Sequence, residues 1–317
     1  MPAIYAKAPG KIILFGEHAV VYGQPAIAIP VQKVFATARV FPEFKAPHNE
    51  IRIKAPDIQL DAKLADLPGH HPFAQAIRLT LEALTLEQAP ACTLMISSTI
   101  PISAGMGSSA AISVAIVRAL SDFLGKSLPP DTISSLAFEV EKIQHGTPSG
   151  IDNTVIAHQT PVFFTFGGPI EHLAVEHPTH WVIADTGEKT PTKETVADVR
   201  ELYTAKPESL NAIFQGIGDI AKKARPALVT ADLSRLGELM DQNQHLLDQL
   251  TVSSPSLENL IMAARTAGAV GAKLSGGGRG GNMIALAPSE DTQALAAALR
   301  DAGATRVITT TLTKGGR

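Results

Sequence analysis

The sequence is poor in cysteine and has no excess of positive charge. Its single cysteine, Cys92, cannot form an internal disulfide or supply a multi-thiolate zinc site. The 27 lysines and arginines are outnumbered by 30 aspartates and glutamates, so the formal net charge is −3. Such a chain has no strong positive field to hold nucleic acid or an anionic membrane by charge alone. These absences argue against a disulfide-stapled secreted scaffold and favour a cytoplasmic protein with no nucleic-acid partner.

Apolar segments of the kind that cross a membrane are also missing. In residues 1–11, lysines, a proline and a glycine interrupt any apolar signal-peptide core. Residues 88–117 carry no charged side chain, but proline, glycines and serines break this stretch into a strand, a loop and a helix start. We therefore expect buried core around a polar turn here, and no membrane partner.

Strand patterns and helix patterns alternate irregularly along the 317 residues. The layout is α+β and not a regular βαβ repeat, and a polar stretch before the strand at 181–185 places a boundary between domains 1–178 and 179–317. Strands are predicted at 11–16, 26–31, 34–40, 91–100, 162–166, 181–185, on both sides of 276–281, and at 306–312. Helices are predicted at 72–86, 108–124, 131–145, 192–203, 209–223, 233–249, 256–267 and from 290.

The segment 101–110, with the sequence PISAGMGSSA, joins a predicted strand to a predicted helix. Its glycines let the backbone turn N–H groups onto a ligand, and Ser108 and Ser109 fall at the helix N-terminus, which attracts phosphate. A helix cap with a tight turn is the alternative. The spacing also fits a dinucleotide loop, but a second helix follows where that site needs a strand ending in an acidic residue, so we reject it.

Two further segments carry unusual patterns. Residues 273–282, KLSGGGRGGN, place five glycines in a run of six, which is costly to order and favours close backbone approach to a ligand. Residues 9–25, PGKIILFGEHAVVYGQP, place Lys11 at the start of a strand and Glu17 and His18 at its exit. One such residue alone is usually solvated, but here all three flank one strand.

These three segments together resemble the signature motifs of the GHMP kinases (galacto-, homoserine, mevalonate and phosphomevalonate kinases). They stand in the family's order and at its separations, from Pro9 to Asn282. Within the family, GEHAVVYG and the loop GTPSGIDN at 146–153 are most similar to the mevalonate kinases. The resemblance implies a two-domain α+β fold, with an N-terminal ribosomal-protein-like β/α domain and a C-terminal ferredoxin-like α+β domain.

The resemblance also implies an activity, the transfer of the γ-phosphoryl group of ATP to the 5-hydroxyl of mevalonate with Mg²⁺ as cofactor. Asp152 would accept the hydroxyl proton, and Lys11 would keep Asp152 ionised. Glu141 and the hydroxyl of Ser109, with Ser108 as the alternative, would be the metal ligands. From the sequence alone, a solvated helix carboxylate is the preferred interpretation of Glu141, because charged residues flank it.

Two further sets of residues complete the implied site. For the nucleotide, the resemblance implies Pro101, Ala104, Gly105, Met106, Gly107, Ser108, Ser109, Ala110, Gly276, Gly277 and Gly278. For the acceptor alcohol, it implies Glu17, His18, Gly150, Asp152 and Thr186. Arg279, inside the last glycine run, either reaches a phosphate or is merely solvated.

Other functions stay open at this point. Another GHMP kinase, such as a phosphomevalonate kinase, a mevalonate 3-kinase or a sugar kinase, is one alternative, because residues 188–194 depart from the small side chains of many relatives. A non-catalytic metabolite sensor is the other, although such proteins usually lose the base or the metal ligand, and Asp152 and Glu141 are both present. The resemblance also suggests a homodimer.

Overall fold

The computed structural model describes residues 3–86, 88–101, 105–145, 148–188, 190 and 192–313. Two compact units make up the chain. The first unit comprises residues 1–10, 34–101 and 107–159, and the second comprises 11–33, 102–106 and 160–317. Because the chain leaves the first unit at residue 10 and returns to it at 34, the segment with Lys11, Glu17 and His18 belongs to the second unit. The domain boundary at 178/179 stays a prediction.

The sheet of the first unit has the order β4-β3-β5-β2, and β1 pairs with β2. β5 runs parallel to β3, while β2–β5 and β3–β4 are antiparallel. Alternate residues of β3 are buried, as expected for a sheet that packs on one face. The strands are β1 (Ile4–Phe15), β2 (Ala26–Pro42), β3 (Ile51–Ala55), β4 (Leu60–Lys63) and β5 (Cys92–Ser98).

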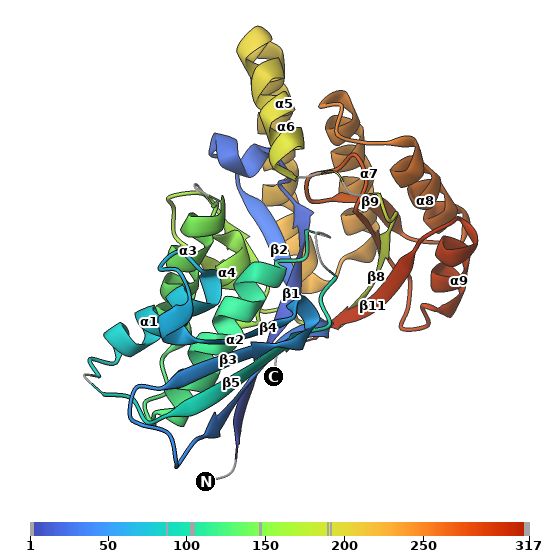
Figure 1. Cartoon of the computed structure of the whole chain (residues 1–317). Coiled ribbons are helices and arrows are strands. Elements are labelled where there is room, and N and C mark those ends of the chain that lie inside the picture. Colours follow the sequence, from blue (N-terminus) through green and yellow to red (C-terminus); the bar gives the residue numbers. More distant parts are fainter. Residues whose placement is uncertain are drawn as a thin grey trace. The chain divides into compact units, whose positions relative to one another are not determined.

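Helices cover this sheet in the first unit (Figure 1). The helix α2 contacts β5 and packs against the three other helices. Its alanines, valines and isoleucine are buried, so small side chains let it lie close to its neighbours. The helices are α1 (Pro72–Ala83), α2 (Ser108–Phe123), α3 (Pro130–His145) and α4 (Ile151–His158), with short 3₁₀ turns at Pro56–Ile58 and Leu64–Asp66.

The second unit is built on an antiparallel sheet of order β11-β8-β10-β9. Trp181 of β8 is completely buried in its core, and all five residues of β9 and of β10 are buried. In the same unit the first residues of β2 pair with β6, which pairs with β7. The strands are β6 (Val162–Phe164), β7 (Glu171–His172), β8 (Thr179–Asp185), β9 (Gly271–Ser275), β10 (Asn282–Leu286) and β11 (Arg306–Leu312).

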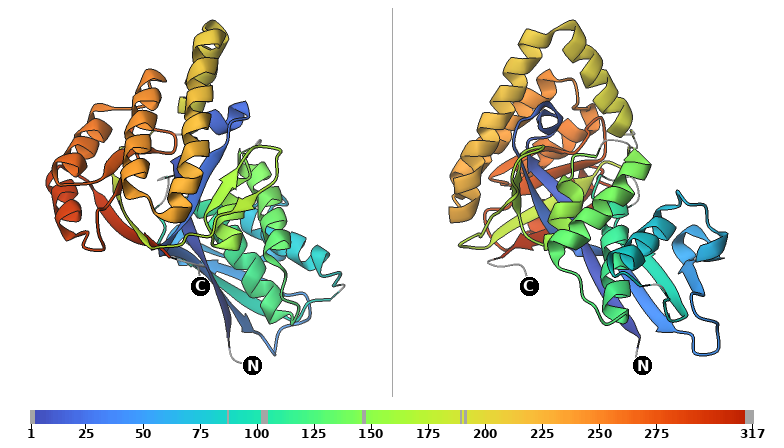
Figure 2. Two further views of the ribbon diagram at one scale, coloured as in Figure 1. Left: turned by 180° about the vertical axis from the view of Figure 1, so that it is seen from behind. Right: turned by 90° about the vertical axis from the view of Figure 1, so that its left-hand side faces the viewer.

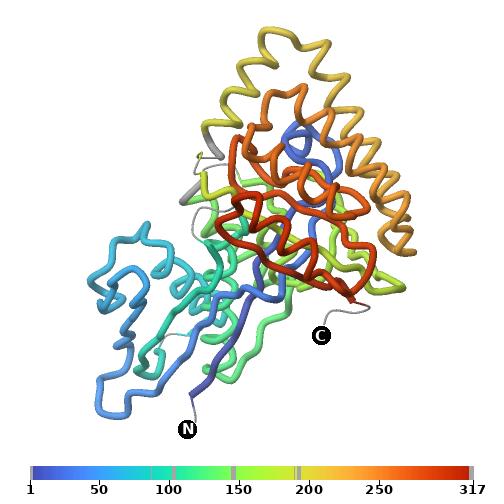
Figure 3. Tube along the Cα trace, turned by 90° about the vertical axis from the view of Figure 1, so that its right-hand side faces the viewer, coloured from blue at the N-terminus to red at the C-terminus, as the bar shows by residue number. Residues whose placement is uncertain are grey.

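Five α-helices and one 3₁₀ turn are described in the second unit. α5 and α6 diverge from a turn at Lys206 (Figure 2), and α9 lies beside β11 (Figure 3). The side chains of Asp232 and Ser254 cap α7 and α8 by accepting backbone N–H bonds. The helices are α5 (Thr192–Ala205), α6 (Pro207–Thr230), α7 (Leu233–Gln249), α8 (Pro255–Thr266), α9 (Gln293–Asp301) and the turn Ala19–Tyr22.

Most predicted elements are present, with one fusion and four omissions. The bounds of α7 and β11 are those predicted from the sequence. The strands predicted at 26–31 and 34–40 were wrong as separate elements, because β2 runs unbroken through both. The sequence prediction missed β3, β4, β7 and α4. Among the described residues, no helix is long and apolar enough to span a membrane.

Candidate functional site

The first glycine loop leads directly into α2. Gly105 and Gly107 have φ angles of +65° and +70°, in the left-handed region that favours glycine. Gly107 is the N-cap of α2 and has no side chain to cap it, so the first amides of the helix are available to an anion. Met106 and Ala110 are buried on either side. Ala104 lies outside the described residues.

Glu141 and Ser109 meet at the start of α2. The Ser109 hydroxyl donates a hydrogen bond of 2.5 Å to Glu141 Oε1. Only 5% of Glu141 is exposed, so it is not the solvated helix carboxylate that its charged neighbours suggested. Those neighbours, Glu139 and Lys142, form an exposed ion pair of their own at 2.7 Å.

This pair of side chains fits a magnesium ion by its chemistry. Carboxylate and hydroxyl oxygens are hard donors, and Mg²⁺ in phosphate sites commonly takes one or two protein ligands and fills its shell with water and phosphate oxygens. Within the described ranges, no three His, Cys, Asp or Glu side chains gather in a way that could hold a metal.

Asp152 lies in the first turn of α4. The N-cap of this helix is Gly150, with φ of +85°. α4 is fixed to α3 by the buried side chain of Asn153, whose Nδ2 donates to the carbonyl oxygen and to the hydroxyl of Ser134 at 3.1 and 2.8 Å. Because Glu141 is also on α3, this anchor relates the two carboxylate-bearing helices.

Lys11 lies in the part of β1 that belongs to the second unit. It is only 5% exposed, and its backbone N–H donates to the carbonyl oxygen of Met106 at 3.0 Å. The strand that carries Lys11 is therefore tied to the residue in the middle of the first glycine loop.

The turn that follows β1 requires glycine. Gly16 has φ of +98°, and a Cβ there would lie 2.5 Å from Cα of Ala26. The next residue, Glu17, is completely buried. Its Oε1 forms an ion pair with the equally buried Lys273, and its Oε2 accepts a hydrogen bond of 3.1 Å from Asn243.

His18 has a defined protonation state. Burial lowers its pKa from 6.5 to about 4, so the imidazole is neutral at pH 7. Its Nε2 lies 3.0 Å from the carbonyl oxygen of Gly277. Because a carbonyl oxygen can only accept, Nε2 carries the proton and Nδ1 carries the lone pair. The neutral ring therefore suits a hydroxyl donor better than a carboxylate.

The third glycine loop packs tightly against the loop after α7. Gly276 and Gly278 have φ angles of +89° and +76°. A Cβ at Gly278 would collide with the carbonyl oxygen of Val252, whereas Gly276 has open space around it. Gly278 therefore sets the close approach of two backbones, and Gly276 is free to face a ligand.

Arg279 is held by contacts within the protein. The sequence suggested instead that it reaches a phosphate or is merely solvated. Its Nε donates to the carbonyl oxygen of Thr251 at 3.1 Å, and its guanidinium forms an ion pair with Asp198 of α5. The residue also adopts a φ of +54°, which is unusual for a side chain with a Cβ. Arg279 thus joins the glycine loop to α5.

Thr186 follows β8 and lies beside the third glycine loop. Its N–H donates to the carbonyl oxygen of Gly281 at 2.9 Å, and its hydroxyl accepts from the N–H of Glu188 at 3.2 Å. The side chain is half-buried. Lys189 and Pro191, where the sequence departs from many relatives, lie outside the described residues.

Two residues of this region escaped prediction. Lys273 and Asn243 are the partners of Glu17. Lys273 was visible in the segment 273–282, as the one charged residue of an otherwise uncharged strand. Asn243 lies on the buried face of α7, because it is three residues from Met240 and four from Leu247, the spacing of one helix face. A polar residue on a buried helix face was the signal that could have found it.

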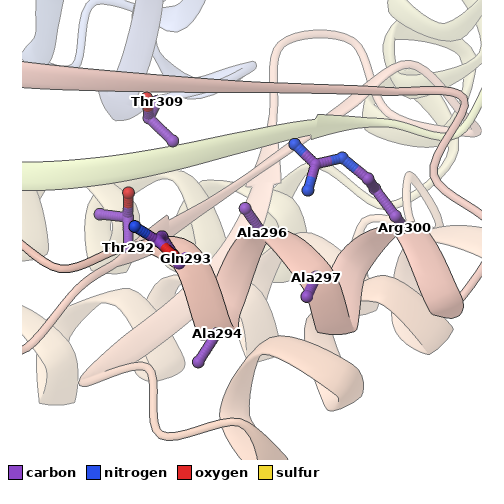
Figure 4. A pocket seen from close by; sticks show the side chains of 7 residues that line it. All are labelled: Thr292, Gln293, Ala294, Ala296, Ala297, Arg300 and Thr309. Atoms are coloured by element: carbon purple, nitrogen blue, oxygen red, sulfur yellow. The ribbon is translucent and has the colours of Figure 1, made fainter.

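A hollow of about 620 Å³ lies beside α9 in the second unit (Figure 4). The side chain of Arg300 extends along it from α9, and Thr309 of β11 lies across from the helix. None of the predicted site residues lines it. The lining residues are Thr292, Gln293, Ala294, Ala296, Ala297, Arg300 and Thr309.

Comparison with known proteins identifies the family. The family models of the GHMP kinases N-terminal domain and the GHMP kinases C-terminal domain match residues 72–168 and 224–305. The mevalonate kinase of Pyrococcus furiosus is 39% identical over 96% of this chain and 95% of its own. That of Pyrococcus horikoshii is 38% identical over 99% and 97%.

Solved structures agree with this assignment. The L. major mevalonate kinase in complex with R-mevalonate has a TM-score of 0.83 and 30% identity over 99% of this chain and 97% of that one. The Methanococcus jannaschii mevalonate kinase has a TM-score of 0.83 and 27% identity, with 98% of each chain covered. The chain belongs to the GHMP kinases, and it is an ATP-dependent kinase acting on a hydroxyl group. The family and the two-domain α+β fold expected from the sequence are confirmed.

Proposed function

We propose that this enzyme transfers the γ-phosphoryl group of ATP to the 5-hydroxyl of mevalonate, in the pathway to isoprenoids. The observation that carries the proposal is near-complete similarity to mevalonate kinases, 39% identity over 96% of the chain. The part-buried Ser109–Glu141 contact and Asp152 at the start of α4 support it, because they offer hard oxygen ligands for a metal ion and a carboxylate that could act as a base. Phosphoryl transfer needs positioning and charge neutralisation more than covalent chemistry.

In this proposal Asp152 is the general base. It accepts the proton of the acceptor hydroxyl as that oxygen attacks the γ-phosphorus, and the bond from this phosphorus to the departing ADP breaks. Lys11 adds positive charge that lowers the hydroxyl pKa and favours the ionised Asp152. The two residues belong to different structural units, and their assignment to one reaction rests on the family resemblance.

Glu141 and Ser109 would hold Mg²⁺, with Ser108 as the alternative hydroxyl ligand. The ion, when bound, would neutralise negative charge on the phosphates of ATP. Before binding, the hydrogen bond from Ser109 keeps the Glu141 carboxylate in a fixed orientation. Both oxygens are therefore preorganised by the protein.

The remaining predicted residues divide between nucleotide and acceptor. The amides of the first glycine loop and of Gly276–Gly278 would hold the phosphates without a basic surface, which agrees with the net charge of −3. His18, Gly150 and Thr186 would face the acceptor. Because the one cysteine is buried and unpaired by any disulfide, we propose a cytoplasmic location, and the resemblance suggests a homodimer.

ADP release with a panel of acceptors tests the proposal. We expect turnover with mevalonate to exceed that with phosphomevalonate, galactose and homoserine by orders of magnitude. Preference for another acceptor would assign the enzyme to another branch of the family. ATP binding without ADP release on any acceptor would instead indicate a metabolite sensor.

A further inference from the structure

Glu17 has no surface with which to contact a ligand. Its side chain is completely buried, and both carboxylate oxygens are occupied, one by Lys273 and the other by Asn243. Lys273 is equally buried and also donates to the carbonyl oxygen of Leu274 at 2.6 Å. The sequence placed Glu17 against the acceptor alcohol, but these contacts point to a role inside the protein.

The partners of Glu17 come from elements that are far apart in the sequence. Glu17 follows β1, Asn243 lies in the middle of α7, and Lys273 lies in β9, three residues before the third glycine loop begins. The ion pair therefore fixes the exit of β1 to the strand that delivers the loop. All of these residues belong to the second unit.

Two further hydrogen bonds join β1 and the turn after it to the segment that contains the third glycine loop. The Ser275 hydroxyl donates to the carbonyl oxygen of Ile13 at 2.7 Å, and His18 donates to the carbonyl oxygen of Gly277. Lys273 and Ser275 are spaced by two within β9, so they lie on one side of the strand, and Gly277 follows two residues later in the glycine loop. Each contacts β1 or the turn after it, and together they set the register between the two motifs.

We propose that Glu17 is a positioning residue: its ion pair with Lys273 and its hydrogen bond from Asn243 hold His18 and the third glycine loop in one fixed arrangement. The identity of the ligands, acceptor at His18 and nucleotide at the loop, rests on the proposed function. Through this cluster the acceptor-side imidazole and the phosphate-side loop form a single body. A change at Glu17 therefore disturbs binding of both substrates, although it contacts neither.

The chemistry of the cluster favours positioning over plain stabilisation. A buried ion pair gains little over well-packed apolar residues, because both ions lose their hydration, but its geometry is specific and its disruption is costly. Asn243 Oδ1 is buried without a hydrogen-bond partner among the described residues, while its Nδ2 serves Glu17. An asparagine that leaves one polar atom unsatisfied to orient a carboxylate is consistent with a directional role.

The test combines a spectroscopic readout in ligand-free protein with steady-state kinetics. Histidine-selective ¹⁵N NMR reports the His18 tautomer, with a protonated Nε2 expected in the wild type. Glu17→Gln leaves an uncompensated Lys273, so we expect the His18 signals to shift and the KM values for ATP and for the acceptor both to rise, on the order of tenfold. The variant Glu17→Gln/Lys273→Met removes both charges and is expected to regain much of each loss.

Two further variants keep the outcome decisive. Asn243→Leu keeps the ion pair and should show the same changes at smaller size, even if Glu17→Gln fails to fold. Glu238→Gln, at an exposed ion pair on the same helix, is the matched control and should change nothing. A Glu17→Gln or Asn243→Leu enzyme with unaltered His18 signals and a KM change for the acceptor alone would overturn the proposal in favour of direct contact.

The NMR arm also separates this inference from the proposed function. If the acceptor panel shows another substrate, the His18 signature still reports whether the cluster positions the ring. If the panel confirms mevalonate and the signature does not respond to Glu17→Gln or Asn243→Leu, the positioning role fails alone.

Discussion

The two structural units each bury a glutamate of the predicted site, and the two glutamates are held in different ways. Glu17 of the second unit is completely buried in an ion pair with Lys273, whereas Glu141 of the first unit is 5% exposed and accepts a hydrogen bond from the neutral hydroxyl of Ser109. A carboxylate with a cationic partner has its charge matched inside the fold. One oriented by a hydroxyl can share its oxygens with a cation that arrives with a ligand, so burial alone does not assign a role.

The largest expected effect belongs to the first unit, at Asp152. Asp152→Asn removes the proposed base but preserves the shape of the side chain, and we expect kcat to fall about a thousandfold, within the range for loss of a general base. ADP release at saturating substrates measures it. ATP affinity, followed by calorimetry, should stay within about twofold of the wild type if the role is chemical. Near wild-type turnover would contradict the assignment.

The two glutamates themselves give the next effect. Glu17→Gln should lower the free energy of unfolding by about 3–5 kcal/mol, because it leaves the Lys273 ammonium buried without its partner. Loss of the charged hydrogen bond from Ser109 in Glu141→Gln should cost less, about 1.5–3 kcal/mol, but this variant should raise the magnesium concentration for half-maximal activity roughly tenfold. Urea unfolding and magnesium titration of both variants measure these changes.

The outcome of that pair of experiments bears directly on the comparison. Equal losses of stability with no change in the magnesium requirement would mean that both glutamates are structural. A magnesium effect at Glu17 and none at Glu141 would reverse the proposed roles.

A pH dependence follows from His18 in the second unit. Burial lowers its pKa from 6.5 to about 4, so the unfolded state binds more protons than the folded state between these values. Stability contributed by the neutral ring is complete above pH 6.5 and falls as the pH drops, by about 3 kcal/mol at pH 4. The difference in unfolding free energy between wild type and His18→Gln should therefore shrink across this window. A difference that is constant with pH would show that His18 does not resist protonation.

The sequence predicted the longer elements with a clear period and missed short ones, including β3, whose five residues alternate, and α4, which shows no period. α7 shows apolar residues at helical spacing, and its bounds match. α4 is buried nearly all round from Ile151 to Ala157, so it has no polar face to reveal a helix. In β2, the exposed pair Gln32 and Lys33 resembled a turn, whereas the strand continues through them as the chain passes from the second unit to the first.

The candidate site divides in the same way. The glycine loops could be recognised because their residues are local in sequence and carry unusual composition. The partners of Glu17 could not, because Asn243 and Lys273 are more than two hundred residues away and only the tertiary fold brings them to it. The burial of Glu141 was equally invisible, since its charged neighbours on the same helix face outward.

The smallest effect compares glycines of the two loops. Gly105→Ala and Gly278→Ala both place a side chain at positive φ, +65° and +76°, and each pays about 1 kcal/mol for that conformation. Only at Gly278 would the new methyl collide with backbone, at the Val252 carbonyl. We expect Gly278→Ala to cost about 2 kcal/mol more in urea unfolding. Equal losses in the free energy of unfolding would mean that the third loop can shift to accommodate the methyl group, and that its packing against Val252 does not hold it in place.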